Sequence, residues 1–172
     1  WELYIIFPFE GNMLKDFLPY LSDFKVIKQP MWTYLPKAQR KRSVLSLSWR
    51  CIRSAWKIGL YLKKIKPDFV VTNTITIPSG AIAAKFLGYK HLWFIHEIPP
   101  KTKTINFLLN ESLVISLINR LSKYVVTTSD YALSYYKQVG VKPSKIVRVY
   151  QSVEFTKTTS VSKPFKCYTL AL

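Results

Sequence analysis

The feature that most constrains the fold of this chain is a regular alternation of short apolar runs with stretches of helical pattern. Four of the apolar runs have the length and the β-branched or aromatic composition of buried strands. They lie at 69–73, 91–95, 124–127 and 146–150. Buried apolar strands that alternate with helices are typical of a parallel sheet covered on both faces. The sequence therefore predicts an α/β fold with a doubly wound parallel sheet.

Proline, glycine and capping residues mark the expected ends of several helices. Pro78 and Gly88 bound one helix, since proline is favoured near a helix start and glycine just past its end. Ser129 is expected to cap another helix, which Gly140 ends. The helix that Ser129 caps is predicted at 130–139, and further helices are predicted at 13–21, 43–65 and about 105–122. Two further strands are predicted at 3–7 and 25–27, followed by a loop at 28–37.

Polar side chains follow the predicted strands at their carboxyl ends. His96 and Glu97 come directly after the second of the four runs, in HLWFIHEIPP. Asn73 and Thr74 end the first run, and Ser129 follows the third. In open α/β sheets, ligands bind in the crevice beyond the carboxyl ends of the strands. We therefore expect a ligand site here, with simple capping of a strand end as the alternative for His96.

The net charge of +17 is unevenly distributed along the chain. Residues 37–66 contain ten Lys or Arg and no Asp or Glu. A block of this kind implies an anionic partner, which is a membrane surface, a nucleic acid or a phosphorylated substrate. On a helical wheel the basic residues form a stripe about 80° wide, namely Arg42, Arg50, Arg53, Lys57 and Lys64. An apolar stripe lies beside it, formed by Leu45, Trp49, Ile52 and Trp56.

Two interpretations of this helix are open. In the simpler one, the apolar stripe packs on the sheet and the basic stripe is solvated. In the other, Arg50, Arg53 and Lys57 face anionic lipid headgroups, where each basic residue contributes ~1 kcal/mol. A nucleic acid is disfavoured as a partner because the sequence has no zinc-finger spacing, aromatic RNA-binding signature or GXXG loop.

Other chemistries lack the residues that they need. The sequence has no P-loop and no G-x-S-x-G nucleophile elbow. Its two histidines, His91 and His96, lie on one predicted strand, and Cys51 and Cys167 are far apart. No metal site and no bound cofactor are therefore expected. Two distant cysteines suit a reducing compartment better than a disulfide framework.

Several stretches, taken in order, resemble the N-terminal, acceptor-side domain of family 4 retaining glycosyltransferases, which have the GT-B fold. IKPDFVVTNT is followed by SGAIAAKFLGYKHLWFIHEIPP and later by INRLSKYVVTTSDYALSYYKQVGVKPSKIVRVYQSVE. IIFPFEGNMLKDFLPYLSDFKVIKQPMW is similar to the second strand, the Pro-x-x-Gly turn and the next helix of that domain. FKCYTLAL is similar to the first strand of the nucleotide-binding domain. The resemblance implies a Rossmann-like domain at 1–150, an interdomain linker at 151–164 and the start of a second domain at 165–172.

The resemblance also implies an activity and a set of site residues. The expected reaction moves a sugar, with retention, from a nucleotide-activated donor to a glycan or lipid-linked acceptor. Such an enzyme would act in cell-envelope or polysaccharide biosynthesis, in the cytoplasm or peripherally on the inner face of a membrane. His96 matches a histidine that contacts the donor sugar in this family. Glu97 is expected to accept a hydrogen bond from an acceptor hydroxyl or to hold the imidazole, and Asn73, Thr74 and Ser129 to contact substrate.

A different class of protein is the alternative, namely a non-catalytic basic α/β domain that binds an anionic membrane surface or a nucleic acid.

The chain also departs from the family pattern. The family's first strand and Gly-rich loop would precede Trp1, and the paired glutamates of the second domain would follow Leu172. We therefore expect this sequence to be a piece of a longer protein. Gln151 and Ser152 stand where members often have Asn-Gly or Asn-Pro.

Overall fold

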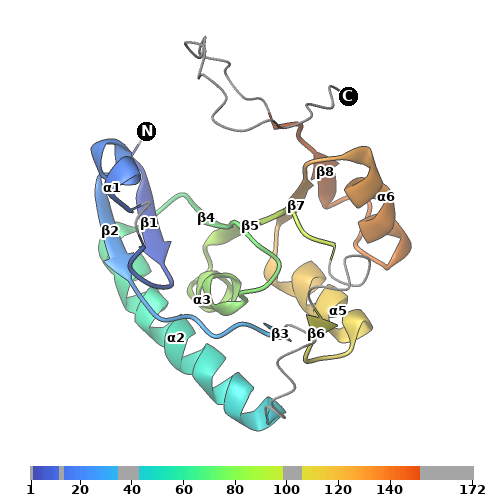
Figure 1. The fold of residues 1–172 in the computed structure, drawn as a ribbon, viewed down its shortest axis with the longest axis horizontal. Helices are drawn as coiled ribbons and strands as arrows, with labels where there is room; N and C mark the ends of the chain where they lie inside the picture. The colour runs from blue at the N-terminus through green and yellow to red at the C-terminus, as the bar shows by residue number, and fades with distance from the viewer. Residues whose placement is uncertain (1, 12–13, 35–42, 99–105, 152–172) are drawn as a thin grey trace, which may run out of the picture.

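The centre of the fold is a parallel sheet of four strands in the order β4-β5-β7-β8 (Figure 1). The computed structural model describes residues 2–11, 14–34, 43–98 and 106–151. The four strands are Phe69–Thr72, Lys90–Ile95, Tyr124–Thr127 and Ile146–Arg148. Each lies within two residues of its predicted bounds, so the α/β class and the parallel sheet are confirmed. The predicted linker beyond Gln151 and the strand at 165–172 lie outside the described residues.

Three helices connect these strands, and a longer helix precedes the first of them. They are α2 (Val44–Ile65), α3 (Ser79–Leu87), α5 (Glu111–Leu121) and α6 (Asp130–Gln138). Gly88, with a φ of 76°, ends α3 in the left-handed region, where glycine has no Cβ to strain. The Ser129 hydroxyl accepts a hydrogen bond from the Ala132 N–H at 3.2 Å, so its predicted capping of α6 is confirmed.

The helices cover one face of the sheet. Trp93, Ile95 and Val125 point to this face and are buried in a cluster with residues of α3, α5 and α6. The alternate residues of the strands point the other way, because successive side chains of a strand alternate between faces. Among these, Val71 and Val147 are about half exposed. The predicted cover on both faces is thus seen on one face within the described part of the chain.

Two small sheets accompany the central one. β1 (Tyr4–Phe7) pairs in parallel with β2 (Asp23–Val26), and β3 (Thr33–Tyr34) pairs antiparallel with β6 (Asn106–Phe107). The short helix α1 (Leu14–Phe17) and a 3₁₀ turn (Leu18–Tyr20) replace the single helix predicted at 13–21. β3 and β6 fall where a loop and the start of a helix were predicted, so both predictions are wrong at these positions. The Asn110 side chain caps α5 by accepting from the Ser112 N–H at 2.9 Å, which starts that helix at Glu111.

The long helix α2 has the predicted bounds but presents an unexpected face to the core. Its inward residues include Leu47, Cys51, Ile58 and Leu62, and α2 packs on α3. The stripe of Leu45, Trp49, Ile52 and Trp56 is exposed. The interpretation in which that stripe packs on the sheet is therefore wrong. None of the helices that the structure describes has both the length and the hydropathy of a transmembrane span.

Candidate functional site

Four of the five predicted site residues come together at the carboxyl edge of the sheet. β4 and β5 are neighbours in the sheet, so the residues that follow them emerge side by side. The Nε2 atom of His96 lies 2.6 Å from Oδ1 of Asn73. The hydroxyl of Thr74 donates to the Glu97 carboxylate at 2.5 Å. Sequence reasoning placed these residues at the same edge, and the structure joins them in two hydrogen-bonded pairs.

The carboxylate of Glu97 is largely occupied by the polypeptide around it. Besides the Thr74 hydroxyl, it accepts from the backbone N–H of Ile75 at 3.1 Å and from that of His96 at 3.3 Å. A carboxylate that accepts several N–H and O–H groups fixes the backbone that carries them. Glu97 therefore clamps the turn after β4 to the end of β5, and it sets the position of His96.

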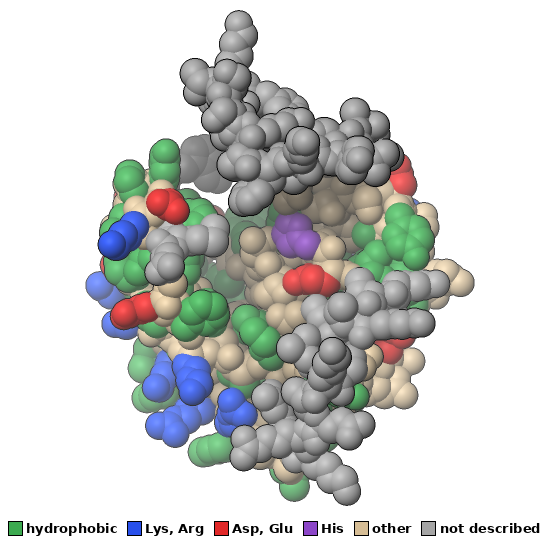
Figure 2. All heavy atoms as spheres, in the orientation of Figure 1, with side chains coloured by type: hydrophobic (Ala, Val, Ile, Leu, Met, Phe, Trp, Pro, Cys, Tyr) green, Lys and Arg blue, Asp and Glu red, His purple; other side chains and the backbone are tan. Residues whose placement is uncertain are grey.

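His96 itself is exposed on this edge, in contrast to His91, which is buried. Its ring packs edge-on against Phe94 at a centroid distance of 4.5 Å. Because an amide oxygen can only accept, the contact with Asn73 requires a proton on Nε2. No hydrogen bond within the described residues engages the other ring nitrogen, Nδ1. Figure 2 shows an exposed histidine side chain near the middle of the molecular face, in a hollow between the N-terminal strands and α6.

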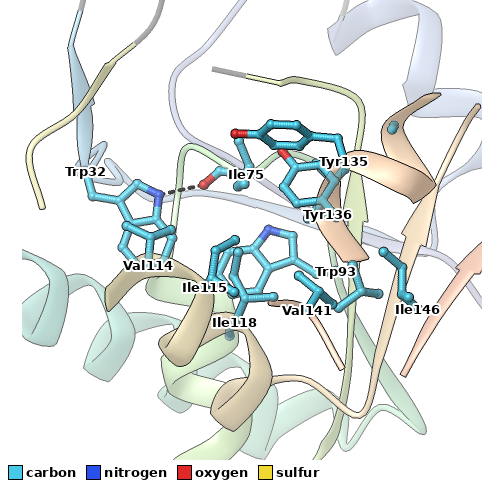
Figure 3. Packing of buried hydrophobic residues seen from close by; sticks show 14 of the residues in the cluster. Trp32, Ile75, Trp93, Val114, Ile115, Ile118, Tyr135, Tyr136, Val141 and Ile146 are labelled. Carbon is cyan, nitrogen blue, oxygen red and sulfur yellow. Dashed lines mark hydrogen bonds between the residues drawn. The ribbon is translucent and has the colours of Figure 1, made fainter. Parts of the chain in front are cut away.

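Aromatic side chains beneath the edge hold the turn after β4 in place. The indole N–H of Trp93 donates to the Thr74 carbonyl at 2.6 Å, and that of Trp32 to the Ile75 carbonyl at 2.5 Å (Figure 3). The hydroxyl of Tyr136 donates to the Glu97 carbonyl at 2.5 Å. Burial, followed by nearby Tyr135 and acidic groups, raises the pKa of Tyr136 well above its usual range, so the hydroxyl stays a donor. These three residues were missed as supports of the site, since their roles depend on contacts between distant segments.

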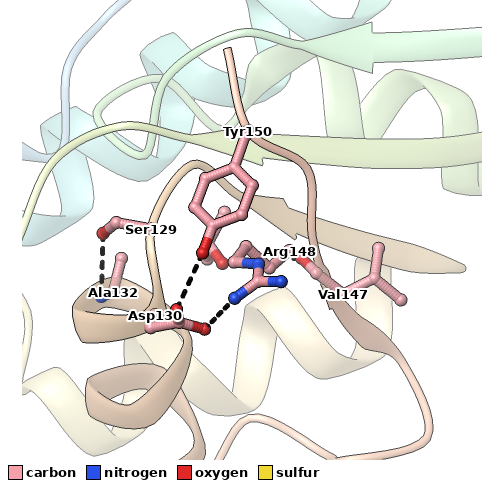
Figure 4. A network of polar contacts seen from close by, with 7 residues as sticks. Ser129, Asp130, Ala132, Val147, Arg148 and Tyr150 are labelled. Atoms are coloured by element: carbon pink, nitrogen blue, oxygen red, sulfur yellow. Dashed lines mark hydrogen bonds and ion pairs between the residues drawn. The ribbon is translucent and has the colours of Figure 1, made fainter.

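Ser129 lies at the same edge but belongs to a separate polar network. Its hydroxyl caps α6, and no hydrogen bond in the described part of the chain links it to the other four residues. Beside it, Asp130 accepts from the Tyr150 hydroxyl at 2.9 Å and pairs with Arg148 (Figure 4). The hydrogen bonds from Tyr150 and then from Arg148 lower the pKa of Asp130. Arg148 was not predicted as a site residue, because the predicted strand ran to residue 150 and the observed one ends at Arg148.

The groups at this edge suit a polyhydroxylated ligand. An imidazole, an amide and a hydroxyl can each donate or accept with neutral hydroxyl groups. Within the described ranges, no three His, Cys, Asp or Glu side chains gather as a metal site would require.

Cys51 is buried in the core, and burial raises its pKa to about 11, which keeps it a thiol rather than a nucleophilic thiolate. Cys167 lies outside the described residues.

The fold and this edge define a parallel α/β domain of the kind that binds its ligand beyond the carboxyl ends of its strands. Residues 25–157 match the family model described as Glycosyltransferase Family 4. The chain belongs to this family. No curated protein matches the chain.

Crystal structures of Alr3699/HepE from Anabaena have a similar fold. The structure with UDP-glucose gives a TM-score of 0.61 at 14% identity and covers 88% of this chain. The structure with UDP and glucose gives a TM-score of 0.58 at the same identity. The match spans only 36% and 37% of those two chains, respectively. At this level of identity the likeness shows a common fold, which confirms the expected GT-B relationship of this domain.

Proposed function

We propose that this chain is the acceptor-side part of a glycosyltransferase that moves a sugar from a nucleotide-activated donor to a glycan or lipid-linked acceptor, with retention. The observation that carries the proposal is the cluster of His96, Asn73, Thr74 and Glu97 at the carboxyl edge of a family 4 domain. The presence of UDP-glucose in the HepE crystals supports a nucleotide sugar as donor. Cell-envelope or polysaccharide synthesis is the proposed setting, and the donor is a substrate rather than a bound cofactor.

The proposed role of His96 is to contact the donor sugar as charge develops at the reacting carbon. Retaining transfer of this kind passes through an oxocarbenium-like state, for which positioning and electrostatic stabilisation supply the catalysis. With Nε2 engaged by Asn73, the Nδ1 atom is the one that faces a sugar hydroxyl. Glu97 acts as a positioning residue, because its carboxylate is hydrogen-bonded to the backbone of His96. Asn73, Thr74 and Ser129 remain proposed substrate contacts.

The test compares His91, which lies in β5, with His96, which follows that strand, in the full-length protein. His96→Ala should lower kcat by about 10²–10³, as loss of one contact made in the transition state does, and should leave the thermal midpoint unchanged. His91→Gln is the matched control, because His91 is buried and bonded to Thr72 and Ser122. It should lower the midpoint and leave turnover unchanged.

Two outcomes would contradict the proposal. If His96 only caps a strand, His96→Ala removes ~1 kcal/mol of stability and leaves turnover intact. If the protein is a non-catalytic binding domain, no transfer occurs from any nucleotide sugar to a glycan or lipid-linked acceptor. Turnover and melting measured on the same purified samples separate these cases.

We further propose that the protein acts peripherally on the cytoplasmic face of a membrane, with Arg50, Arg53 and Lys57 facing anionic lipid. All three side chains are exposed, and none forms an ion pair among the described residues. A lipid-linked acceptor would be delivered at such a surface, and this supports the orientation. Nucleic acid is not proposed as a partner.

A further inference from the structure

The outer face of α2 carries an exposed apolar strip that we call the tryptophan stripe. It consists of Leu45, Trp49, Ile52, Trp56 and Leu60, which are 83%, 67%, 54%, 64% and 51% exposed. At a rise of 1.5 Å per residue, the stripe runs for about 22 Å along the helix. Isolated exposed apolar residues are ordinary, but a continuous strip of large ones marks an interaction surface.

The stripe is not a poorly packed part of the core. The opposite side of α2 already supplies the inward residues, among them Leu47, Ile58 and Leu62, which are at most 5% exposed. The helix therefore has two apolar faces, one buried and one exposed. Fold stability accounts for the first face and leaves the second without a role.

Basic residues border the stripe and define the chemistry of its partner. Arg50, Arg53 and Lys57 follow one edge of it, and α2 contains no Asp or Glu. Figure 2 shows Lys and Arg side chains gathered over the α2 region, with hydrophobic side chains beside them. The partner surface must accordingly be apolar in its interior and anionic at its border. A bilayer with anionic headgroups has both properties, and tryptophan prefers the boundary between them.

We propose that α2 lies in the headgroup plane of an anionic bilayer, with the tryptophan stripe inserted among the acyl chains and Arg50, Arg53 and Lys57 on the lipid phosphates. The inference rests on the membrane partner proposed above and goes beyond electrostatic attraction. It assigns insertion to named residues, and it fixes which side of the domain meets the lipid. α2 runs along the periphery of the molecule (Figure 1), so contact with lipid leaves the carboxyl edge of the sheet open.

A partner helix is the main rival, because the stripe repeats with a spacing of three and four residues. A helix–helix interface with this spacing normally uses Leu, Ile or Val as its large residues. Two tryptophans and a one-sided basic border favour the lipid surface. The experiment below treats a protein partner as an outcome that overturns the proposal.

The test uses the full-length protein and vesicles of phosphatidylcholine with or without phosphatidylglycerol. Binding is measured by cosedimentation, and insertion by quenching of tryptophan emission with lipids brominated on their acyl chains. The wild-type protein should bind only the anionic vesicles and be quenched there. Trp49→Gln with Trp56→Gln should weaken binding by about tenfold or more, since one large apolar side chain contributes ~1.5–3 kcal/mol when buried.

Two control variants test whether binding and quenching arise from the tryptophan stripe. Trp49→Phe with Trp56→Phe keeps the stripe apolar, so binding should persist while quenching is lost. Trp32 and Trp93 are buried in the fold and should stay unquenched. Phe86→Gln removes an apolar residue that is 84% exposed on a different helix, α3, and should leave binding unchanged.

Binding without quenching in the wild-type protein would overturn insertion, and so would quenching in the Phe variant as strong as in the wild-type protein. Equal binding by the Gln variant would overturn the role of the stripe, as would self-association through α2 in place of vesicle binding. Thermal midpoints equal to that of the wild-type protein confirm that the variants fold. The outcome is independent of the proposed activity, because sugar transfer without insertion refutes only this inference, and insertion without sugar transfer refutes only the function.

Discussion

His91 lies on β5 and His96 follows its last residue, and the two have opposite surroundings. His91 is 1% exposed. Its ring lies between the hydroxyls of Thr72, at 2.8 Å, and Ser122, at 3.3 Å. Both partners are neutral, so nothing in contact with the ring compensates a positive charge. Burial accordingly lowers the pKa of His91 from 6.5 to about 4.

This shift predicts that acidification destabilises the fold through His91. Between pH 6.5 and pH 4 the unfolded chain binds a proton at this residue and the folded chain does not, so the free energy of unfolding decreases as the pH falls. The loss is at most about 3 kcal/mol and is complete below the folded pKa of about 4. Urea unfolding of the wild-type protein and of His91→Gln should give different slopes against pH in this window. Parallel slopes would show that His91 does not titrate on unfolding.

At this scale, the sequence predicted where site residues stand but not how they are connected. The rule about carboxyl ends of strands located His96, Asn73 and Thr74 correctly at one edge. The clamp by Glu97 depends on which carboxylate oxygen meets which N–H group, and that is settled only by the three-dimensional path of two turns. The support from Trp32 joins segments separated by 43 residues, which no local pattern encodes.

Among the elements, strong local signals gave accurate predictions and ambiguous ones failed. The strand at Tyr124–Thr127 and the helix at Val44–Ile65 agree with prediction to within a residue. The start of α5 was predicted too early, because the apolar residues before Asn110 continue a helical pattern without joining the helix. The orientation of α2 could not be predicted because both of its faces are apolar.

The end of α2 offers a direct test of local backbone strain. Its C-cap, Lys66, has φ 47° and ψ 59°, a left-handed conformation that disfavours any residue with a Cβ. Lys66→Gly should therefore raise the free energy of unfolding by ~0.5–1 kcal/mol. Lys63→Gly, in the last turn of the same helix, is the matched control and should lower it by ~1 kcal/mol. A loss of stability in both variants would contradict the strain at Lys66.

Across the whole molecule, burial is concentrated around the central sheet. No residue of β1, β2 or α1 is fully buried. Within the described residues, the β1–β2 pair shares no strand pairing with the four-stranded sheet. Ile6 of β1 and Ile27, which follows β2, pack in a cluster with Ala55, Ile58 and Leu62. β5 and β7, by contrast, contribute fully buried side chains to the main core.

This contrast predicts two levels of protection against amide hydrogen exchange. Backbone amides of β1 and β2 should exchange through local opening at lower free energy than those of β5 and β7, because fewer apolar contacts oppose their opening. Exchange measured by mass spectrometry on peptides covering 4–7, 23–26, 91–95 and 124–127 provides the comparison. Equal protection in all four peptides would mean that the described domain opens as one cooperative unit.

The stacked indoles beneath the site give the protein an intrinsic spectroscopic probe. Trp32 and Trp93 lie 5.7 Å apart, with ring planes only 7° from parallel. At so short a separation the electronic transitions of two indoles couple, and their circular dichroism depends on the angle between them. The same two rings hold the carbonyls of Ile75 and Thr74. Any ligand that shifts the turn after β4 will therefore change the shape of the near-ultraviolet spectrum, without a label and without turnover.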